Sequence, residues 1–206
     1  MRGQPFWERA YREDSVDPFG PASAEVLDLL VTLRSGSSVL DLGCGAGRHA
    51  LACSRAGMMV TGVDVSPVAC SRLRTAAADI RDRLQVIQED ISRFKFTRQY
   101  DVVIAHGVLH LLPRADRVEI LTRIQSYTVP GGTNVVAIFT NRLPSPPDLE
   151  AVTLGLFDEG ELFRAYLGWD IILQRAYTMC DEHPGGVRHE HPVNKIVARK
   201  PKALEE

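Results

Sequence analysis

Runs of apolar and β-branched residues alternate with helical patterns along most of this 206-residue chain, and few folds accommodate such an order. Strands are predicted at 38–42, 58–63, 84–87, 101–105 and 134–140; helices are predicted at 48–56, 67–78 and 116–127, after an earlier one with the apolar stripe Val26, Leu29, Leu30 and Leu33. Parallel strands joined by helices close through right-handed crossovers. The alternation therefore predicts a doubly wound, Rossmann-like α/β sheet with helices on both faces.

The last third of the chain has a different pattern. Asp158 and Glu161 have the spacing of a helix start, Gly168 is typical of a helix end, and the helix between them is expected to bury Leu162, Tyr166 and Leu167. Strands are predicted at 170–175 and 193–199, and the polar segment between them has no helical pattern. We therefore expect an antiparallel hairpin at the edge of a mostly parallel sheet. In the helix at 116–127, Val118, Leu121 and Ile124 are expected to face inward.

Composition favours one folded domain over residues 1–206, because hydrophobic residues make up 45% and charged residues 24% of the chain. The formal net charge of −2 gives no field that would collect nucleic acid. No apolar run approaches the length of a membrane span, and the N-terminus has no signal-peptide pattern, so a cytoplasmic protein is expected. Cys44, Cys53, Cys70 and Cys180 lack the spacing of a zinc site and are expected to be reduced thiols.

Three glycines follow the first predicted strand, and ligands of open α/β sheets bind beyond such strand ends. Gly43, Gly45 and Gly47 remove the Cβ atom at alternate positions, which lets a ligand lie against the backbone. A dinucleotide fingerprint needs glycine or alanine where Arg48 stands, so a pyrophosphate site is disfavoured. The loop therefore predicts a ligand without that group.

Acidic residues also follow the next two predicted strands. Asp64 is placed where a carboxylate accepts hydrogen bonds from both ribose hydroxyls. Asp90 can accept a hydrogen bond from the amine of an adenine, and Ile91 can pack against its ring. Together, these strand ends describe a nucleoside-type ligand that needs no pyrophosphate.

The pattern Asp41-x-Gly43-x-Gly45-x-Gly47, with Asp64 and Asp90-Ile91, resembles the class I S-adenosylmethionine-dependent methyltransferases over roughly residues 36–140. The resemblance implies one methyltransferase domain with a seven-stranded sheet, S-adenosylmethionine as cofactor and S-adenosylhomocysteine as product. The cofactor-binding residues it implies are Asp41 at the ammonium group, Gly43, Gly45 and Gly47 along the methionine part, Asp64 and Val65 at the ribose, Asp90 and Ile91 at the adenine, and the backbone around His106 at the amino acid end.

Shorter segments are similar to the tellurite-resistance, TehB-type methyltransferases. They are Gly45-Ala-Gly-Arg48-His49, Trp7 and Tyr11, residues 157–162, Gly168-Trp169 and residues 197–200. This resemblance implies a small-molecule acceptor, such as a thiol or a tellurite-like or selenite-like oxyanion. Residues 1–20 are expected to form a lid, with Trp7 and Tyr11 over the sulfonium, and residues 141–165 a cap.

Candidate residues for the chemistry lie outside the glycine loop. Arg48 is expected to contact the substrate or a neighbouring loop. His106 and His110 follow the fourth strand and could act as bases or as polar wall residues. His189 and His191 would face the same side if their segment is extended, and are expected to orient the substrate or take part in catalysis; no metal site is expected.

Two other functions remain open from the sequence. One is an NAD(P)-dependent oxidoreductase with a Rossmann fold, against which Arg48 argues. The other is a nucleoside-binding protein without catalysis. The sequence leaves the oligomeric state open between monomer and homodimer, and predicts neither a nucleic-acid nor a membrane partner.

Overall fold

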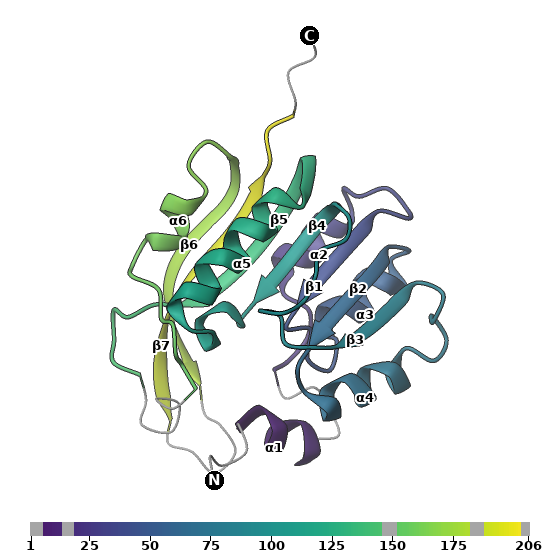
Figure 1. Ribbon diagram of the computed structural model, residues 1–206, viewed down its shortest axis with the longest axis horizontal. Coiled ribbons are helices and arrows are strands. Elements are labelled where there is room, and N and C mark those ends of the chain that lie inside the picture. Colours follow the sequence, from purple (N-terminus) through teal and green to yellow (C-terminus); the bar gives the residue numbers. More distant parts are fainter. Residues whose placement is uncertain (1–5, 14–18, 146–151, 182–187, 203–206) are drawn as a thin grey trace. The chain divides into compact units, whose positions relative to one another are not determined.

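In the computed structural model of the chain, the residues described are 6–13, 19–145, 152–181 and 188–202. They belong to two compact units, Met1–Lys95 and Phe96–Glu206, which we call the first and the second unit. Figure 1 traces the elements of both units in chain order. The expectation of a single domain over residues 1–206 stays a prediction.

The first unit is a three-stranded parallel sheet with helices after its strands. Its elements are α1 (Phe6–Glu13), α2 (Ala24–Leu30), β1 (Ser38–Leu42), α3 (Arg48–Arg55), β2 (Met59–Asp64), α4 (Pro67–Ala76) and β3 (Leu84–Gln88). The strands follow the order β3-β2-β1, and Asp41 pairs in register with Gly62. The side chain of Ser66 accepts a hydrogen bond from the backbone of Ala69 at 3.0 Å, which confirms the predicted helix start.

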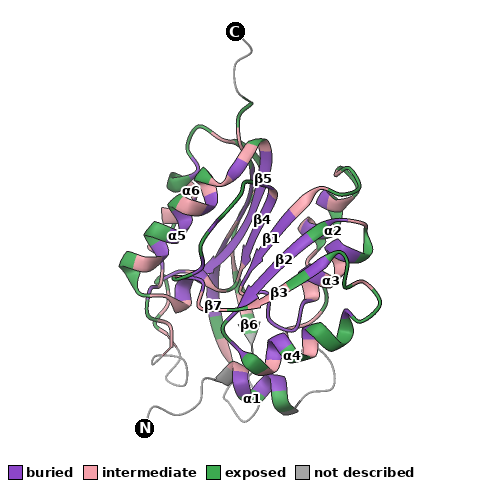
Figure 2. Cartoon of the chain, turned by 45° about the vertical axis from the view of Figure 1, so that its right-hand side comes forward, coloured by how far each residue is buried: buried purple, intermediate pink, exposed green. Residues whose placement is uncertain are grey.

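The second unit contains four strands. Its elements are β4 (Tyr100–His106), the 3₁₀ turn η1 (Leu109–Leu111), α5 (Arg114–Ser126), β5 (Thr128–Phe139), α6 (Glu161–Ala165), β6 (Asp170–Asp181) and β7 (His189–Arg199). β4 and β5 are parallel, whereas β7 is antiparallel to both β5 and β6. The seven strands make up a mixed sheet that is mostly parallel and ends in an antiparallel hairpin, as predicted. Buried residues concentrate in β1, β2, β4 and β5 (Figure 2).

The hairpin is longer than predicted. β6 continues to Asp181 instead of ending at residue 175, and β7 begins at His189 instead of residue 193. Residues 189–192 pair with β6, whereas β5 pairs with β7 only from Val193 onward. The added residues of β7, His189 to Pro192, have no apolar alternation from which to predict a strand, whereas those of β6 include Tyr177 and Met179, which the prediction overlooked.

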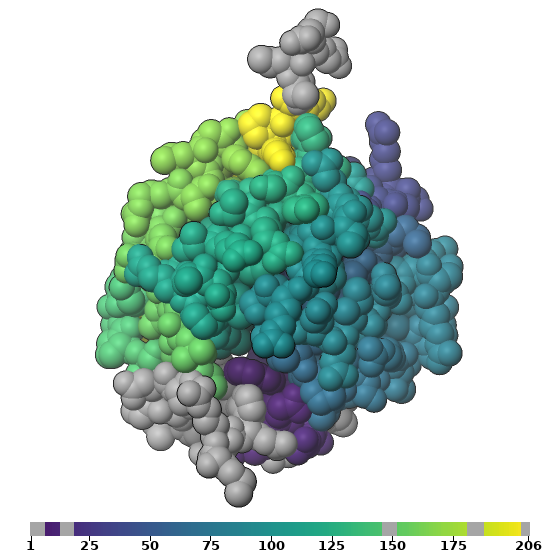
Figure 3. All heavy atoms as spheres, in the orientation of Figure 1, coloured from purple at the N-terminus to yellow at the C-terminus, as the bar shows by residue number. Residues whose placement is uncertain are grey.

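Two predicted core residues are exposed. Val118 in α5 is 49% exposed, and the outer face of this helix lies on the molecular surface (Figure 3). The buried stripe of α5 contains Arg117 and Ile120 beside the predicted Leu121 and Ile124. The prediction for Val118 was wrong because Arg117, one residue earlier, is the side chain that faces the interior.

Leu167 is 80% exposed, whereas Leu162 and Tyr166 are buried as predicted. α6 ends at Ala165, and the chain has already left the helix when it reaches Leu167. Gly168 has a φ of +86°, but α6 ends three residues earlier, at Ala165, so Gly168 does not terminate the helix as predicted. The backbone of Asp158 donates to the Glu161 carboxylate at 2.8 Å, as a capping pair should.

Hydrogen bonds tie the described part of the expected cap, residues 152–165, to the end of β5. Thr140 forms a parallel bridge with Phe157, and its hydroxyl donates to the Glu159 carboxylate at 2.7 Å. Asn194 of β7 donates to the same carboxylate at 2.9 Å and accepts from the backbone of Gly160 at 2.9 Å. This segment is therefore fixed to the second unit; its role as a cap stays a prediction.

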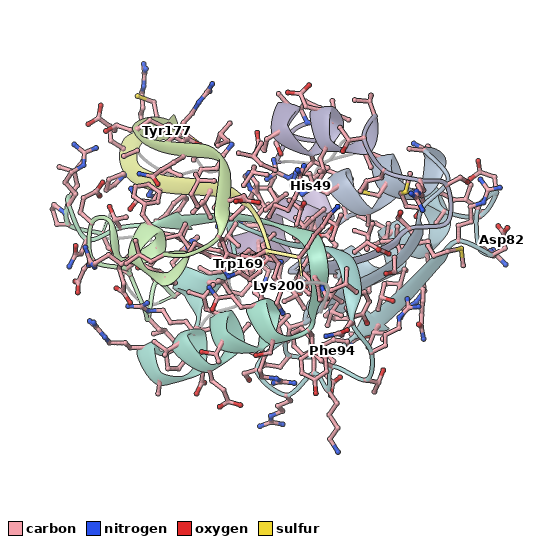
Figure 4. The ribbon with its side chains drawn as sticks, turned by 90° about the horizontal axis from the view of Figure 1, so that it is seen from above. His49, Asp82, Phe94, Trp169, Tyr177 and Lys200 are labelled. Carbon is pink, nitrogen blue, oxygen red and sulfur yellow. The ribbon has the colours of Figure 1, made fainter. Side chains whose placement is uncertain are left out.

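Two residues from the segments that resemble TehB, Lys200 and Trp169, contact each other in the second unit. The Lys200 ammonium donates to the carbonyls of Gln125 and Thr128, each at 2.8 Å, at the C-terminus of α5. It also lies 6.0 Å from the ring centroid of Trp169 (Figure 4). A lysine at a helix C-terminus satisfies carbonyl groups that lack partners within the helix. These two signature residues are thus structural.

Among the described residues, none of the helices combines the length and apolarity that crossing a lipid bilayer requires.

Candidate functional site

The glycine loop after β1 is held against the end of β2 by its own backbone. The amides of Gly43 and Cys44 both donate to the carbonyl of Val63, at 2.8 and 3.1 Å. The amide of Gly45 donates to the Asp64 carboxylate at 2.8 Å. Gly43 and Gly45 have positive φ values of 69° and 55°, which L side chains rarely adopt, so the loop requires glycine there.

Asp64 organises this loop. It is 9% exposed, and its second carboxylate oxygen accepts a hydrogen bond from the backbone of Ser66 at 2.8 Å. Burial raises the pKa of Asp64, and the hydrogen bonds from Ser66 and Gly45 oppose this shift. Since each carboxylate oxygen can accept two hydrogen bonds, Asp64 keeps acceptor capacity for the two hydroxyls of a ribose. The ribose role assigned to Asp64 therefore remains compatible with its geometry.

Asp41 presents a buried acceptor with unused capacity. The side chain is 1% exposed, and its Oδ2 atom has no hydrogen-bond partner within the described part of the chain. Burial raises the pKa of Asp41 to about 7; Arg48 lowers it, and the negative charge of Asp64 adds to the increase. Buried polar atoms are nearly always paired, so this oxygen fits a ligand that brings a hydrogen-bond donor or a positive charge. The ammonium group of S-adenosylmethionine meets that requirement.

The raised pKa of Asp41 predicts a pH-dependent affinity for S-adenosylmethionine. A cationic ligand binds the ionised carboxylate, so binding must release the proton that Asp41 holds below pH 7. We expect the affinity to rise about tenfold from pH 6 to pH 8, with proton uptake by the buffer in calorimetry. In Asp41→Asn this part of the pH dependence should disappear. Parallel pH profiles for both proteins would contradict the assignment.

Helix α1 lies beside α4 (Figure 1) and covers the glycine loop with aromatic side chains. Tyr11 is buried in a cluster with Ala46 and Ala69, and Trp7 packs against it. A Cβ atom at Gly45 would overlap the Tyr11 hydroxyl. Arg72 of α4 donates to the carbonyl of Tyr11 at 2.8 Å. The expected lid residues therefore contact the loop directly, which fits the lid assignment.

Sequence reasoning missed Glu8 of α1. It is 9% exposed, and its carboxylate lies 3.9 Å from the Arg12 guanidinium. Its negative charge contributes to the raised pKa of Asp64, so it faces the same part of the first unit. Glu8 lies next to Trp7 and one turn before Tyr11 and Arg12. This position relative to Trp7 and Tyr11 could have identified Glu8 as a candidate from the sequence.

The residues assigned to the adenine and the ribose differ in exposure and in hydrogen bonding. Asp90 Oδ1 accepts hydrogen bonds from the backbone and hydroxyl of Ser92, at 2.9 and 2.8 Å. Ile91 is 4% exposed, whereas Val65 is 52% exposed. Asp90 and Ile91 follow β3, which pairs in parallel with β2. The carboxylates of Asp64 and Asp90 therefore lie at the same edge of the sheet. Their cofactor roles stay predictions.

Arg48 and His49 begin α3. Arg48 donates to the carbonyl of Phe19 at 2.8 Å, which is the loop contact expected as an alternative to substrate binding. His49 is buried, and its Nε2 lies 3.2 Å from the hydroxyl of Ser23 (Figure 4). Both side chains hold the segment before α2 against α3. A substrate role for Arg48 stays a prediction.

His106 and His110 lie in the second unit, where His106 is the last residue of β4 and His110 lies in η1. His106 is half-buried, and His110 is 2% exposed. His110 Nδ1 accepts a hydrogen bond from the backbone of Phe139 at 3.3 Å. Burial, with a smaller effect from the charge of His191, lowers the pKa of His110 to about 3. His110 is therefore neutral across the physiological range and carries its proton on Nε2.

His189 and His191 lie on β7 and face the same side, as predicted for an extended segment. Their Nε2 atoms are 3.0 Å apart, which is hydrogen-bond distance. The ring of His191 stacks on Phe139 with centroids 4.1 Å apart, and Phe139 stacks in turn on His110 at 4.1 Å. Three of the four candidate histidines thus form one array through a phenylalanine that sequence reasoning did not single out.

All four cysteines are free thiols. Burial raises the pKa of Cys44, takes that of Cys53 to about 12 and takes that of Cys70 to about 11. Because the thiolate is the reactive form, these three thiols are poor nucleophiles. Within the described residues, no group of three or more His, Cys, Asp or Glu side chains is arranged to hold a metal ion.

Most of the comparisons with known proteins relate the chain to methyltransferases. Residues 39–132 match the family described as a methyltransferase domain. The chain is 32% identical to Hemagglutinin 1 of Eikenella corrodens over 65% of its length, and 32% identical to 27-O-demethylrifamycin SV methyltransferase of Amycolatopsis mediterranei over 68%. It is 29% identical to the probable S-adenosyl-L-methionine-dependent methyltransferase TehB of Haemophilus influenzae over 67%. The chain spans about half of these relatives, at 44%, 53% and 48% of their lengths.

The solved structures support the fold. TehB from Haemophilus influenzae superposes with a TM-score of 0.76 and 22% identity, over 94% of this chain and 65% of the other. These comparisons give no support for a nicotinamide-dependent oxidoreductase. The first unit also fits the methyltransferase cofactor, because Asp41 keeps a buried oxygen atom without a hydrogen-bond partner in the described part of the chain. Residues 39–132 therefore match a methyltransferase domain, the chain is similar to the S-adenosylmethionine-dependent methyltransferase TehB, and S-adenosylmethionine is the cofactor that these matches support.

Proposed function

We propose that this protein transfers the methyl group of S-adenosylmethionine to a small soft nucleophile, either a thiol or an oxyanion of the tellurite and selenite type. The unpaired, buried Oδ2 atom of Asp41 beside a Cβ-free loop is the observation that carries the proposal. It demands a donor or a cation from a ligand, and the amino acid end of S-adenosylmethionine supplies one.

Each residue of the first unit has a defined task in this proposal. Asp41 holds the ammonium group and Asp64 the ribose hydroxyls. Asp90 accepts a hydrogen bond from the adenine amine, and Ile91 packs on the adenine ring. Tyr11 and Trp7 offer aromatic rings to the sulfonium, an attraction that strengthens when α1 excludes water.

Orientation is the main contribution that the chain has to make. S-adenosylmethionine supplies a sulfonium leaving group, so no covalent intermediate with the protein is needed. The residues around the loop hold the cofactor so that an acceptor can approach in line, and such alignment contributes a large part of the acceleration in displacement reactions. The buried thiols take no part as nucleophiles, because burial keeps them protonated.

A small acceptor is supported by similarity and by charge. The resemblance of short sequence segments to the tellurite-resistance, TehB-type methyltransferases favours a soft oxyanion, and the Amycolatopsis relative is named for 27-O-demethylrifamycin SV. A net charge of −2 gives no attraction for nucleic acid. Three buried, free cysteines support a reducing compartment, so we place the protein in the cytoplasm.

Two measurements test the proposal. Calorimetry should show binding of S-adenosylmethionine and none of NADH. S-adenosylhomocysteine should then accumulate when an alkyl thiol, selenite or tellurite is added. Binding without product for every acceptor would identify a nucleoside-binding protein, and binding of NADH in place of S-adenosylmethionine would overturn the proposal altogether.

A further inference from the structure

A buried carboxylate lies on the face of α1 that covers the glycine loop. Glu8 is 9% exposed, whereas Arg9 and Arg12 of the same helix are exposed. Tyr11 follows Glu8 by one helical turn, so the two side chains share a face of the helix. Tyr11 is buried against Ala46 of the loop. The face of α1 that carries Glu8 is therefore turned toward the loop.

Contacts within the first unit place Glu8 near Asp64. A Cβ atom at Gly45 would overlap the Tyr11 hydroxyl, so this hydroxyl lies against the loop. The amide of Gly45 donates to the Asp64 carboxylate at 2.8 Å, and the thiol of Cys70 donates to the Asp64 carbonyl at 3.5 Å. Burial raises the pKa values of Asp64 and Cys70, and the negative charge of Glu8 adds to both increases. Glu8 therefore acts electrostatically on the residue assigned to the ribose.

Three carboxylates of the first unit interact through their charges. Burial raises the pKa of Asp41 and the charge of Asp64 adds to that increase, just as the charge of Glu8 does for Asp64. Asp41 also keeps its buried Oδ2 atom without a hydrogen-bond partner among the described residues. Like charges held close together in a buried region are unfavourable, and a bound cation relieves their repulsion. This group of carboxylates therefore favours a cationic ligand over a neutral one.

Arginines also lie in this part of the first unit. Arg12 lies 3.9 Å from the Glu8 carboxylate, but its side chain is 51% exposed, and water screens such a pair. Arg48 and Arg72 each donate to a backbone carbonyl at 2.8 Å. Fixed cations alter the affinity for every cationic ligand. The contribution of Glu8 to the difference between two ligands depends instead on its own distance from the charge that distinguishes them.

We propose that Glu8 is a specificity-determining residue that makes the first unit bind S-adenosylmethionine more tightly than S-adenosylhomocysteine. This inference rests on the proposed function and deepens it, because it concerns the release of the product from the same cofactor site. The two molecules differ by the transferred methyl group and by the positive charge of the sulfonium. A carboxylate that acts through its charge therefore stabilises the bound cofactor but not the bound product.

The aromatic neighbours of Glu8 favour the same form of the cofactor. Trp7 and Tyr11 flank Glu8 in α1 and are the rings that the proposed function assigns to the sulfonium. The face of an aromatic ring attracts a cation, and the exclusion of water strengthens this attraction as well as that of a carboxylate. Transfer of the methyl group leaves a neutral sulfur, so both attractions are lost together. The charge of Glu8 therefore favours release of the product after each turnover.

Calorimetric titration of the full chain with each of the two ligands tests this proposal. We expect the wild type to bind S-adenosylmethionine about tenfold more tightly than S-adenosylhomocysteine. Glu8→Gln should weaken the binding of S-adenosylmethionine about tenfold and change that of S-adenosylhomocysteine less than about twofold, because glutamine keeps the size of the side chain and removes only its charge. Asp82→Asn is the matched control, since it removes an exposed carboxylate of the same unit and should leave both affinities unchanged.

Three outcomes would overturn the proposal. Equal weakening of both ligands in Glu8→Gln would assign Glu8 a structural role in α1, and unchanged binding of both would show that its charge does not reach the cofactor. Equal wild-type affinities for the two ligands would also overturn it, and this measurement decides the question even if Glu8→Gln does not fold. Failure of the wild type to bind either ligand would instead refute the proposed function.

Discussion

Replacing Asp64 with alanine is expected to weaken the binding of S-adenosylmethionine by about 10²- to 10⁴-fold. The proposed binding mode gives Asp64 two hydrogen bonds to ribose hydroxyls, and each hydrogen bond to a charged group contributes about 1.5–3 kcal/mol. The substitution also removes the acceptor for the Gly45 amide, so the loop loses the contact that fixes it to β2. Isothermal titration calorimetry of the wild type and the variant measures this effect.

Two variants separate cofactor binding from other effects. Asp82→Ala removes an exposed carboxylate of the same unit and should leave the affinity unchanged. His110→Ala removes a buried ring of the stacked array and should reduce turnover more than cofactor binding. An unchanged affinity in Asp64→Ala would contradict the assignment of the ribose site. Equal loss of cofactor binding in Asp64→Ala and His110→Ala would contradict the division of roles between them.

Replacing Glu161 with leucine is expected to lower the free energy of unfolding by about 3–5 kcal/mol. Glu161 is the partner of Arg117, whose side chain is 0% exposed and lies 2.7 Å from the Glu161 carboxylate. Arg117 also donates to the carbonyl of Leu156 and stacks over Phe157 at 3.7 Å. The variant leaves a buried guanidinium without its counter-charge, which is far less favourable than an exposed broken pair.

Urea denaturation of the variant measures this loss. Arg114→Ala is the matched control, because it breaks the exposed ion pair of Arg114 with Asp158 and should cost less than about 1 kcal/mol. Adding Arg117→Met to Glu161→Leu should restore most of the lost stability, since the unpaired charge is then gone. Similar losses for Glu161→Leu and Arg114→Ala would show that the buried pair is not the source of the effect.

The same pair has a defined dependence on pH. Burial alone would raise the pKa of Glu161, but the hydrogen bonds from Arg117 and Asp158 and the charge of Arg117 lower it overall. A carboxyl with a lowered pKa in the folded state stabilises that state above its ordinary pKa. The contribution of Glu161 is therefore complete at neutral pH and is lost as the pH falls through its folded pKa.

The sequence by itself determined the parts of this protein that depend on local periodicity and turn chemistry. The alternating strands and helices, the terminal hairpin and the helix start at Ser66-Pro67 all follow from side-chain spacing along one element. The glycine loop and Asp64 could be predicted for the same reason, because strand ends that carry ligands have a recognisable order. The shared face of His189 and His191 followed from the two-residue period of a strand.

Only the tertiary structure decided which of these side chains have partners. Arg117 displaced Val118 from the interior because Glu161, 44 residues later, supplies its counter-charge. Asp41 gained its raised pKa from burial and from Asp64, and Phe139 joined two histidines that are far apart in the chain. Burial and charge at a side chain depend on residues brought close by folding, and no local period records them. Periodicity therefore specified the framework, whereas long-range packing set the chemistry of the site.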